Sequence, residues 1–213
     1  HPILDDVGCV PSYGRTVRHG AVMGSLKKVK TADEILAYIE DWRCQNLGRI
    51  LGSWKLDGLS LRLTYNDGVL VEAATRGDGE FGQDVMDNVK YVPNIPQKLI
   101  AYTPGSRVEV RGEIVLPISV WEKSGRVFAN PRNGASGTLL QKNPKETGRY
   151  PLRFIAYDVR NDHSTTEETK MNFCRLNSIS AIEYFTLDFD KGGLQEFLDK
   201  MDEQRKTLDF GTV

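Results

Sequence analysis

Two runs of alternating apolar and polar residues, one on each side of Asp67-Gly68, constrain the fold of this chain more than any other feature of its sequence. A leucine or tyrosine stands at every second position of 59–65, and a valine or alanine does so in 69–73. A period of two is typical of β-strands that bury one face, and Asp-Gly between two such runs is a strong hairpin signal. The sequence therefore predicts an antiparallel hairpin in this region.

Further elements follow from local patterns elsewhere in the chain. Thr31–Glu34 has the form of a helix capping box, and the apolar residues after it recur at helical spacing until Gly48, where a helix would stop. Strands are expected over 107–116 and 153–159, and another helix around 194–201. These elements predict a mixed α+β domain built on antiparallel hairpins.

The composition limits the classes of protein to consider. With 213 residues, 39% of them hydrophobic and 27% charged, the chain can bury one substantial core, or one core and a small appendage. The net charge of −1 gives no strongly basic footprint for nucleic acid, so any basic groove would be local. No run of about 18 apolar residues is present, so no membrane span is expected, and residues 1–6 lack the pattern of a secretory signal. Cys9, Cys44 and Cys174 are odd in number and form no CxxC pair, so we expect no zinc site and a reducing, cytosolic setting.

The segment Trp54–Gly58, Trp-Lys-Leu-Asp-Gly, joins the end of one expected strand to the start of the next. On its own it is most simply an Asp-Gly turn with a solvated lysine. The alternative is that Lys55 is a nucleophilic amine held rigidly in a cleft. Such an amine reacts in its neutral form, which burial or nearby positive charge favours, and Arg76 or a bound metal could supply that charge.

Thr75–Gly79, Thr-Arg-Gly-Asp-Gly, is a glycine-rich loop that we expect between a strand and a helix near 82–89. A plain connecting loop is the simplest interpretation. The functional alternative is a phosphate contact, because glycines let backbone N–H groups approach an anion and Arg76 offers a bidentate fork.

The strand predicted at 107–116 carries charge along one face. Alternation places Arg107, Glu109, Arg111 and Glu113 together on that face. The face is either a solvated surface with cross-strand ion pairs or the wall of a polar cleft. In a cleft, Glu113 could hold ribose hydroxyls or a metal ion.

Two further segments are ambiguous when taken singly. Phe128–Asn133 contains an Asn-Pro pair, which is a turn signal. Tyr157, within the strand expected at 153–159, is either a core residue or a platform on which a base stacks.

Taken together and in this order, the motifs resemble the NAD-dependent DNA ligases of bacteria and some of their viruses. The matching stretches are Lys-Leu-Asp-Gly at 55–58, Ala-Ala-Thr-Arg-Gly-Asp-Gly-x-x-Gly-x-Asp at 73–84, Glu-Val-Arg-Gly-Glu at 109–113 and Phe-Ala-Asn-Pro-Arg-Asn-x-Ala-x-Gly at 128–137. The likeness runs from Arg18 to Val213, nearly the whole chain. It is specific, because ATP-dependent ligases and capping enzymes share only a looser motif around the lysine.

The resemblance implies an α+β nucleotidyltransferase fold, ATP-grasp-like, with antiparallel sheets flanked by helices around a nucleotide cleft. Residues 1–30, irregular and rich in proline and glycine, would be a lead-in segment with adenine-side contacts, since 18–26 is similar to the family's segment on that side. Residues 31–213 would be the adenylation domain, truncated before the family's second-lysine motif.

The resemblance also implies roles for individual residues. Lys55 and Asp57 would be catalytic. Contacts to the nucleotide would come from Ser25, Leu26, Ser53, Leu56, Arg76, Glu113 and Tyr157, with Arg76 on the phosphates, Glu113 on the ribose and Tyr157 stacked on adenine. Arg132 and Arg205 would contact DNA or phosphate, and Asp57 and Glu113 would hold Mg²⁺.

The implied activity is that of a DNA ligase (NAD+). Lys55 would attack the α-phosphorus of NAD and expel nicotinamide mononucleotide, and the AMP would then pass to the 5′-phosphate of nicked double-stranded DNA so that the nick can be sealed. Cationic side chains and Mg²⁺ would spread the charge of the in-line displacement. The expected compartment is the cytoplasm of a bacterial or phage-infected bacterial cell, with no membrane involved.

Three departures from the family pattern keep other interpretations open. Ser53 stands where the family has a glutamate that meets the adenine, and Leu140 stands where it has an arginine. The chain ends at Phe210–Val213, where the family motif Asp-Gly-Val-Val-Ile-Lys would begin. A fragment, one subunit of a split ligase and a degenerate relative all remain open.

Two alternative functions belong to other classes. The first is a catalytically weak partner subunit that binds nucleotide or DNA and needs a second chain for activity, which Ser53 and Leu140 favour. The second is an ATP-using nucleotidyltransferase, such as an RNA ligase or a capping enzyme. The motifs at 75–79 and 128–133 argue against this second alternative.

Overall fold

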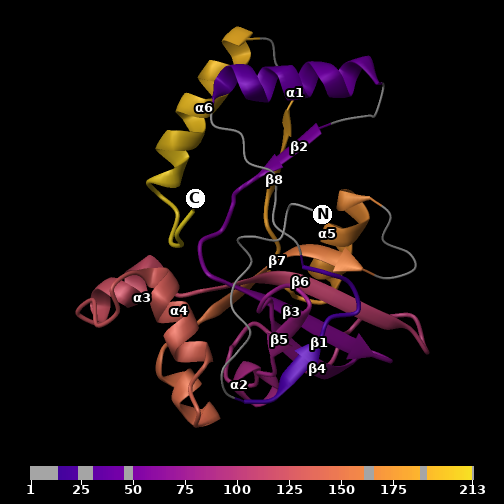
Figure 1. The fold of residues 1–213 in the computed structure, drawn as a ribbon, viewed down its shortest axis with the longest axis vertical. Helices are drawn as coiled ribbons and strands as arrows, with labels where there is room; N and C mark the ends of the chain where they lie inside the picture. The colour runs from indigo at the N-terminus through magenta and orange to yellow at the C-terminus, as the bar shows by residue number, and fades with distance from the viewer. Residues whose placement is uncertain (1–13, 24–30, 46–49, 161–165, 188–190, 213) are drawn as a thin grey trace.

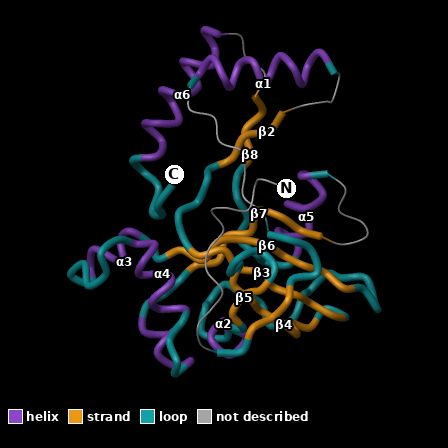
Figure 2. Tube along the Cα trace, in the orientation of Figure 1, coloured by secondary structure: helices purple, strands orange, loops and turns teal. Residues whose placement is uncertain are grey.

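The chain folds into a mixture of helices and antiparallel sheets, seen in a computed structural model that describes residues 14–23, 31–45, 50–160, 166–187 and 191–212 (Figures 1 and 2). The main sheet has four strands in the order β4-β3-β6-β7, and all neighbours are antiparallel. Its strands are β3 (Leu59–Asn66), β4 (Val69–Thr75), β6 (Arg107–Val115) and β7 (Arg153–Arg160). The predicted α+β class with antiparallel sheets is therefore confirmed.

Two short ribbons accompany the main sheet. The first pairs β1 with β5, and the second pairs β2 with β8, both antiparallel. Their strands are β1 (Thr16–Arg18), β5 (Phe81–Gln83), β2 (Ile50–Ser53) and β8 (Tyr184–Leu187). Figure 1 shows the β2-β8 ribbon leading from the main sheet towards α1 (Ala32–Cys44) and α6 (Lys191–Arg205), which pack on each other at one end of the molecule.

The hairpin predicted around Asp67-Gly68 is present as β3 and β4. Asp67 and Gly68 have positive φ angles of 48° and 73°. A two-residue loop with both φ angles positive matches the right-handed twist of the flanking strands, which is why Asp-Gly is favoured there. The strands predicted at 107–116 and 153–159 are β6 and β7, within one residue at one end of each.

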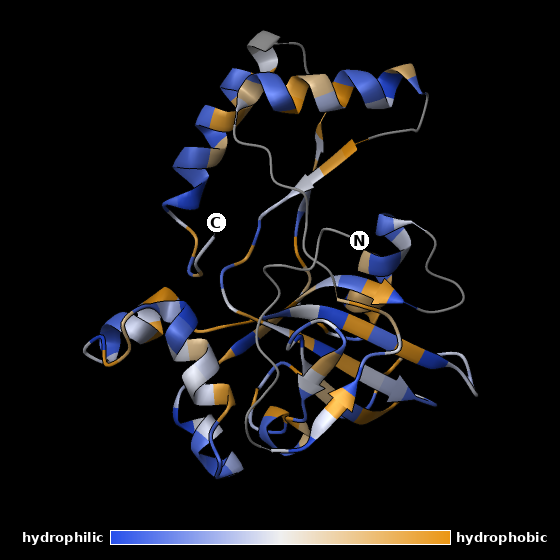
Figure 3. Cartoon of the chain, in the orientation of Figure 1, coloured by the Kyte–Doolittle hydropathy of each residue, from blue (hydrophilic) through white to orange (hydrophobic). Residues whose placement is uncertain are grey.

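One face of the main sheet forms the hydrophobic core. The alternating leucines of β3 and Tyr65 lie opposite apolar residues of β6, and Figure 3 shows this alternation of polar and apolar positions along the strands. The core is closed by α2 (Met86–Val89) with the segment after it, and by α4 (Pro131–Leu139), the 3-10 helix η1 (Pro144–Arg149) and α5 (Glu167–Leu176). Burying these apolar side chains is the main favourable term in folding.

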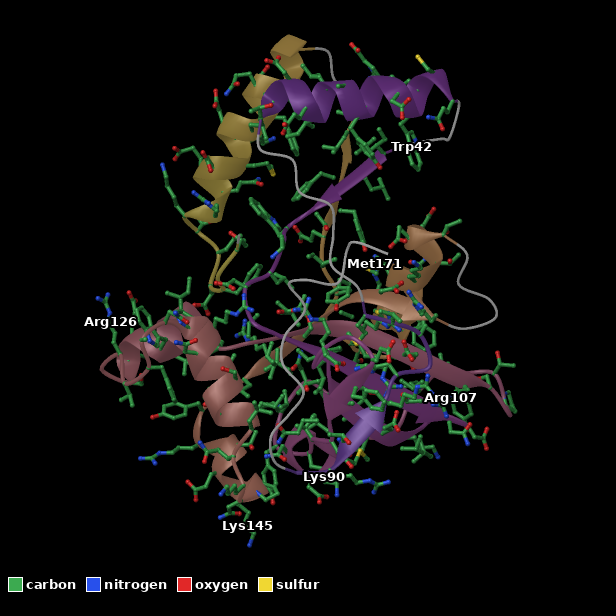
Figure 4. All side chains as sticks on the ribbon, in the orientation of Figure 1. Trp42, Lys90, Arg107, Arg126, Lys145 and Met171 are labelled. Atoms are coloured by element: carbon green, nitrogen blue, oxygen red, sulfur yellow. The ribbon has the colours of Figure 1, made fainter. Side chains whose placement is uncertain are left out.

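The opposite face of the sheet is polar, and the prediction that charged residues of β6 share it is correct. The interpretation as a solvated surface is wrong, because Arg62 and Arg111 expose only 1% and 5% of their surface. Arg62 of β3 forms ion pairs with Glu72 of β4 at 2.6 Å and with Glu109 of β6 at 3.5 Å. Arg107 is the exception, since it is exposed and lies at the end of β6 remote from α3 (Ile118–Lys123) (Figure 4).

Two local expectations are corrected by pairing between distant segments. The helix expected near 82–89 is confined to α2, because Gly82 instead belongs to β5 and pairs with Val17 of β1. For the same reason the lead-in is less irregular than expected, since Thr16–Arg18 is a strand. Neither strand carries an alternating pattern long enough to be recognised from its own sequence.

The helix ends follow local rules more closely. Thr31 caps α1 through a reciprocal capping box with Glu34, as predicted. The helix ends at Cys44 and is capped by Gln45, and the expected stop at Gly48 lies outside the described residues. The helix expected around 194–201 lies within α6. Among the described residues, no helix is both long and apolar enough to cross a membrane.

Candidate functional site

The segment between β2 and β3 carries Lys55 past the polar face of the sheet. Lys55 is exposed, whereas Leu56 is 7% exposed and belongs to a small apolar cluster with Val115 and neighbouring residues of β7. The C-terminal residues run alongside, since Leu56 and Thr212 form an isolated β-bridge. Lys55 is therefore held by its buried neighbour while its own side chain faces outward.

Gly58 sits where any side chain would collide with the sheet. A Cβ at this position would lie 2.1 Å from the carbonyl oxygen of Ile114 and 2.9 Å from Cγ of Glu113. This close approach brings the Gly58 N–H near the Glu113 carboxylate, where it acts to lower the pKa of that group. The glycine of the Lys-Leu-Asp-Gly motif thus has a packing reason beyond the turn that its sequence suggests.

Glu113 is the most buried carboxylate of this group, with 9% of its surface exposed. Burial raises its pKa, and the hydroxyl of Ser60, the N–H of Gly58 and the charges of Arg132 and Arg76 act in the opposite direction. The Ser60 hydroxyl donates to Oε2 of Glu113 at 2.7 Å. Glu113 is therefore an acceptor fixed in place at the edge of a cationic environment.

Arg76 lies at the start of a tight loop that ends at Phe81. Its N–H donates to the carbonyl of Ser60 at 3.0 Å, and its carbonyl lies 3.1 Å from Nε2 of His19. Asp78 closes the loop, since its Oδ1 accepts from the N–H groups of Glu80 and Phe81. Both backbone groups of Arg76 are therefore anchored, and the guanidinium is close enough to Glu113 to lower the pKa of that carboxyl.

His19 supports the loop from a buried position. It is 7% exposed, and its backbone N–H donates to the carbonyl of Glu80. Its ring Nδ1 is buried and has no hydrogen-bond partner among the described residues. Burial lowers its pKa, and the nearby charge of Arg62 lowers it further. We therefore treat His19 as a neutral packing and hydrogen-bonding residue.

Tyr157 owes its position to a β-bulge. Asp158 pairs with Arg111 and Ala156 with Gly112, so Tyr157 is the extra residue of β7. Bulges re-aim side chains and occur beside functional sites. The Tyr157 ring packs against the small apolar cluster, and burial raises the pKa of its phenol.

Arg132 approaches the lysine segment from α4. Its Nη1 donates to Oδ1 of Asp57 at 2.9 Å. Asn130 starts this helix, because its side chain accepts from the N–H of Asn133 and Pro131 occupies the first turn. The Asn-Pro pair thus begins a helix rather than a simple turn.

Contacts and nearby charges link Leu56, Asp57, Arg76, Glu113, Tyr157 and Arg132 of the residues proposed from sequence. Lys55 precedes Leu56 and Asp57 directly, and its own side chain is exposed. Ser53 is exposed at the end of β2, opposite Tyr184 of β8. Arg205 is not linked to this group by any contact of the described residues, and it pairs with Asp202 of its own helix at 3.4 Å. Ser25 and Leu26 lie outside the described residues. In the part of the chain that is described, no group of three or more metal-binding side chains is present.

Three contributors escaped the sequence interpretation: Ser60, His19 and the C-terminal residues around Gly211. Ser60 lies on the predicted polar face of β3, but only the strand register places it opposite Glu113. His19 lies in the lead-in, where its partner is 57 positions away. Gly211 accepts a hydrogen bond from the N–H of Asp57 at 2.8 Å. Each contact joins segments distant in sequence, so no local sequence pattern predicts it.

An open groove lies elsewhere, at the C-terminal end of α4. It is lined by Ser136, Gly137, Leu140, Gln141, Lys142 and Asn143. None of these residues belongs to the group around Lys55. The groove therefore gives no support to the site, which is defined by its contacts.

The group around Lys55 has a coherent chemistry. It combines an amine, carboxylate acceptors suited to sugar hydroxyls, guanidinium groups suited to phosphates and an aromatic ring suited to a base. These are the groups expected of an adenylation domain. A family model described as "NAD-dependent DNA ligase adenylation domain" matches residues 12–212, and the chain belongs to that family.

The chain also aligns with a solved structure described as "Pmar-Lig_Pre.". It aligns with a TM-score of 0.48 and 14% sequence identity over 77% of this chain. The chain spans 37% of the length of that protein. A likeness of this extent supports no conclusion about fold or activity.

Proposed function

We propose that this chain has a nucleotidyltransferase fold of the ATP-grasp-like type and transfers AMP from NAD to Lys55 and then to the 5′-phosphate of nicked double-stranded DNA. The observation that carries the proposal is the meeting of the Lys55–Gly58 segment with Glu113, Arg76 and Arg132, which come from three different parts of the chain. Membership of the family is the independent support.

Lys55 is the nucleophile of the first step. Its neutral Nζ forms a bond to the α-phosphorus of NAD, the bond from that phosphorus to the oxygen of nicotinamide mononucleotide breaks, and the amine releases a proton. Arg76 stabilises the charge that develops on the phosphate oxygens. Preorganised cations of this kind act most strongly where water is partly excluded.

Glu113 and Tyr157 bind the nucleoside half. Glu113 accepts hydrogen bonds from the ribose hydroxyls, and the hydrogen bond from Ser60 keeps the acceptor in place. Tyr157 offers an aromatic face to the adenine beside the apolar cluster that contains Leu56. Ser25, Leu26 and Ser53 remain proposed contacts on the adenine side.

The carboxylates of Asp57 and Glu113 fit the donor set for Mg²⁺. Protein sites for this ion commonly use one or two carboxylates together with substrate phosphates and water. The ion pair of Asp57 with Arg132 uses Oδ1, which leaves Oδ2 as an oxygen ligand for a metal ion. When bound, the ion would neutralise phosphate charge. The ion pair between Asp57 and Arg132 holds the lysine segment against α4.

The second step hands AMP to DNA. An oxygen of the 5′-phosphate attacks the phosphorus, the bond to Nζ of Lys55 breaks, and the 3′-hydroxyl of the nick later displaces AMP. Arg132, with a side chain that is 55% exposed, is available to a DNA phosphate, and Arg205 is proposed for the same role. The function implies the cytoplasm of a bacterial or phage-infected bacterial cell.

Intact mass after incubation with NAD or ATP tests the proposal. We expect an AMP adduct from NAD in the wild-type chain, none in Lys55→Ala, and an unchanged adduct in Lys145→Ala, a matched control on η1. An adduct from ATP alone would contradict the use of NAD. An adduct that persists in Lys55→Ala would show that another residue is the nucleophile.

The alternative of a catalytically weak partner subunit rests on a specific observation. Ser53 is exposed beside the lysine segment, where the family glutamate would meet the adenine. A chain that forms no adduct alone but does so after addition of a second ligase chain would favour this alternative.

A further inference from the structure

Ser60 is the point at which three parts of the candidate site meet. Its backbone carbonyl accepts a hydrogen bond from the N–H of Arg76 at 3.0 Å, and its hydroxyl donates to Oε2 of Glu113 at 2.7 Å. The same hydroxyl is close enough to Tyr157 to influence its titration. No motif in the sequence singles out this serine.

The register of the sheet explains why Ser60 can hold Glu113. The two residues are direct partners on adjacent antiparallel strands, so their side chains leave the same face side by side. The glycine at position 58 leaves no side chain between the lysine segment and Glu113, where a Cβ would come within 2.9 Å of Cγ of Glu113. The serine hydroxyl is therefore a short, fixed donor beside the carboxylate.

A carboxylate with one fixed oxygen presents the other in a defined direction. Rotation about the last bond of a glutamate side chain is otherwise soft, with a broad range of accessible angles. Glu113 is almost fully buried, so an oxygen that lost its donor would remain without water to replace it. The Ser60 hydroxyl thus supplies both orientation and a hydrogen bond to the charged form.

We propose that Ser60 is a positioning residue that holds the Glu113 carboxylate for the ribose hydroxyls of the nucleotide, and so sets the preference for ribose over deoxyribose. This inference rests on the proposed function, because it takes a nucleotide to be bound beside Glu113. It goes beyond that function by assigning sugar selectivity to a residue outside the Lys-Leu-Asp-Gly motif.

Sugar selectivity gives a test that a purely structural role would not pass. A ribose hydroxyl that bonds to an oriented carboxylate loses that bond when either the hydroxyl or the orientation is removed. Binding of AMP, 2′-deoxy-AMP and 3′-deoxy-AMP would be measured by calorimetry with the full chain. In the wild type we expect AMP to bind more tightly than at least one deoxy analogue.

Ser60→Ala is expected to weaken AMP about tenfold, the loss that corresponds to one hydrogen bond to a charged group. The same change should leave the deoxy analogue nearly unaffected, so that the ratio of the two affinities falls. Ser60→Thr keeps the hydroxyl and should restore the ratio. Ser60→Cys has a weak donor of similar size, so its affinity ratio should fall as in Ser60→Ala. It replaces the alanine variant in the test if that variant folds poorly.

Ser119→Ala is the matched control, because Ser119 also donates its hydroxyl to a carboxylate, that of Asp209 at 3.0 Å. Its affinity ratio should equal that of the wild type. An unchanged ratio in Ser60→Ala, or a wild type that binds AMP and both deoxy analogues equally, would overturn the role of Ser60. A wild type that binds none of the three would instead overturn the proposed function.

Discussion

Ser53 lies next to the lysine segment, at the position where the resemblance to the family predicts a glutamate. It ends β2, is exposed and lies opposite Tyr184. A longer side chain at this position has space in which to extend, because the serine itself is not covered. The departure therefore alters the reach of the side chain and leaves the fold intact.

Ser53→Glu is expected to tighten the binding of AMP by about three- to tenfold, the value of one added hydrogen bond. The physical reason is that a glutamate reaches further toward the adenine than a serine does. Calorimetric titration of AMP into both forms measures the effect, with Ser53→Gln to separate reach from charge. Unchanged or weaker binding would show that Ser53 does not occupy the family's glutamate position.

Asp78 gives a pH-dependent prediction. The N–H groups of Phe81 and Glu80 hold the pKa of Asp78 below the usual 3.8. The ionised carboxylate is therefore more stable in the folded state than in the unfolded state. A lowered folded pKa contributes stability above 3.8, and that contribution is lost as the pH falls through the folded pKa. The stabilising effect of Asp78 is therefore present at neutral pH and absent in strong acid.

The measurement is the melting temperature of the wild type and of Asp78→Ala from neutral pH to strong acid. At neutral pH we expect the variant to melt about 2–4 °C lower, as for a loss of roughly 1 kcal/mol in a domain of this size. The two curves should converge at acid pH. Asp78→Asn keeps an acceptor oxygen and should lie between them, whereas a difference independent of pH would exclude a role for the charge.

At the scale of elements, α4 is the support for Arg132. The Asn130 side chain accepts from the N–H of Asn133 at 2.7 Å and so fixes the first turn, on which Arg132 stands. Gly134 and the residues after it pack against the core, where a Cβ on Gly134 would come within 2.4 Å of Leu116. The helix start and the core contact together direct Arg132 toward Asp57.

Asn130→Ala is expected to cost about 1 kcal/mol of stability, the usual value of a helix N-cap. It should also weaken AMP transfer, because Arg132 would lose its fixed position. Asn143→Ala removes the equivalent cap of η1 and is the matched control, since its side chain accepts from Lys145 far from Asp57 in the chain. If both variants lose stability equally and Asn130→Ala still transfers AMP at the wild-type rate, the role given to α4 is contradicted.

At the scale of the whole molecule, the main sheet separates an apolar core from a polar face that is itself buried. Arg62 ties three strands together through Glu72 and Glu109, while Arg111 pairs with Glu109 and donates to the carbonyl of Ala21. The described lead-in residue Ala21 therefore lies against the charged face, on which Arg62 and Arg111 are buried. Breaking one partner of such a network leaves uncompensated buried charge.

Arg62→Ala is expected to destabilise the domain by about 3 kcal/mol or more, measured by urea unfolding. Arg107→Ala removes the same side chain type at an exposed position of the same face, and should cost less than about 0.5 kcal/mol. Replacing Arg62, Glu72 and Glu109 together by apolar residues should recover much of the loss. Equal costs for Arg62→Ala and Arg107→Ala would contradict the buried network.

The sequence by itself determined the elements whose signals are local. Alternation and Asp67-Gly68 were enough for the β3-β4 hairpin, and the capping box at Thr31 was enough for the start of α1. The motifs around Lys55 were likewise visible, because each is a short run of neighbouring residues. Such signals depend only on neighbours within a few positions.

Only the tertiary structure decided which of those residues meet. The contact of Ser60 with Glu113 depends on a strand register, that of His19 with Arg76 on the pairing of β1 with β5, and the aim of Tyr157 on one extra residue in β7. These arrangements join segments tens of positions apart, and a shift of one residue in register would turn each side chain to the opposite face. Local pattern carries no information on that choice, which the packing of the whole sheet makes.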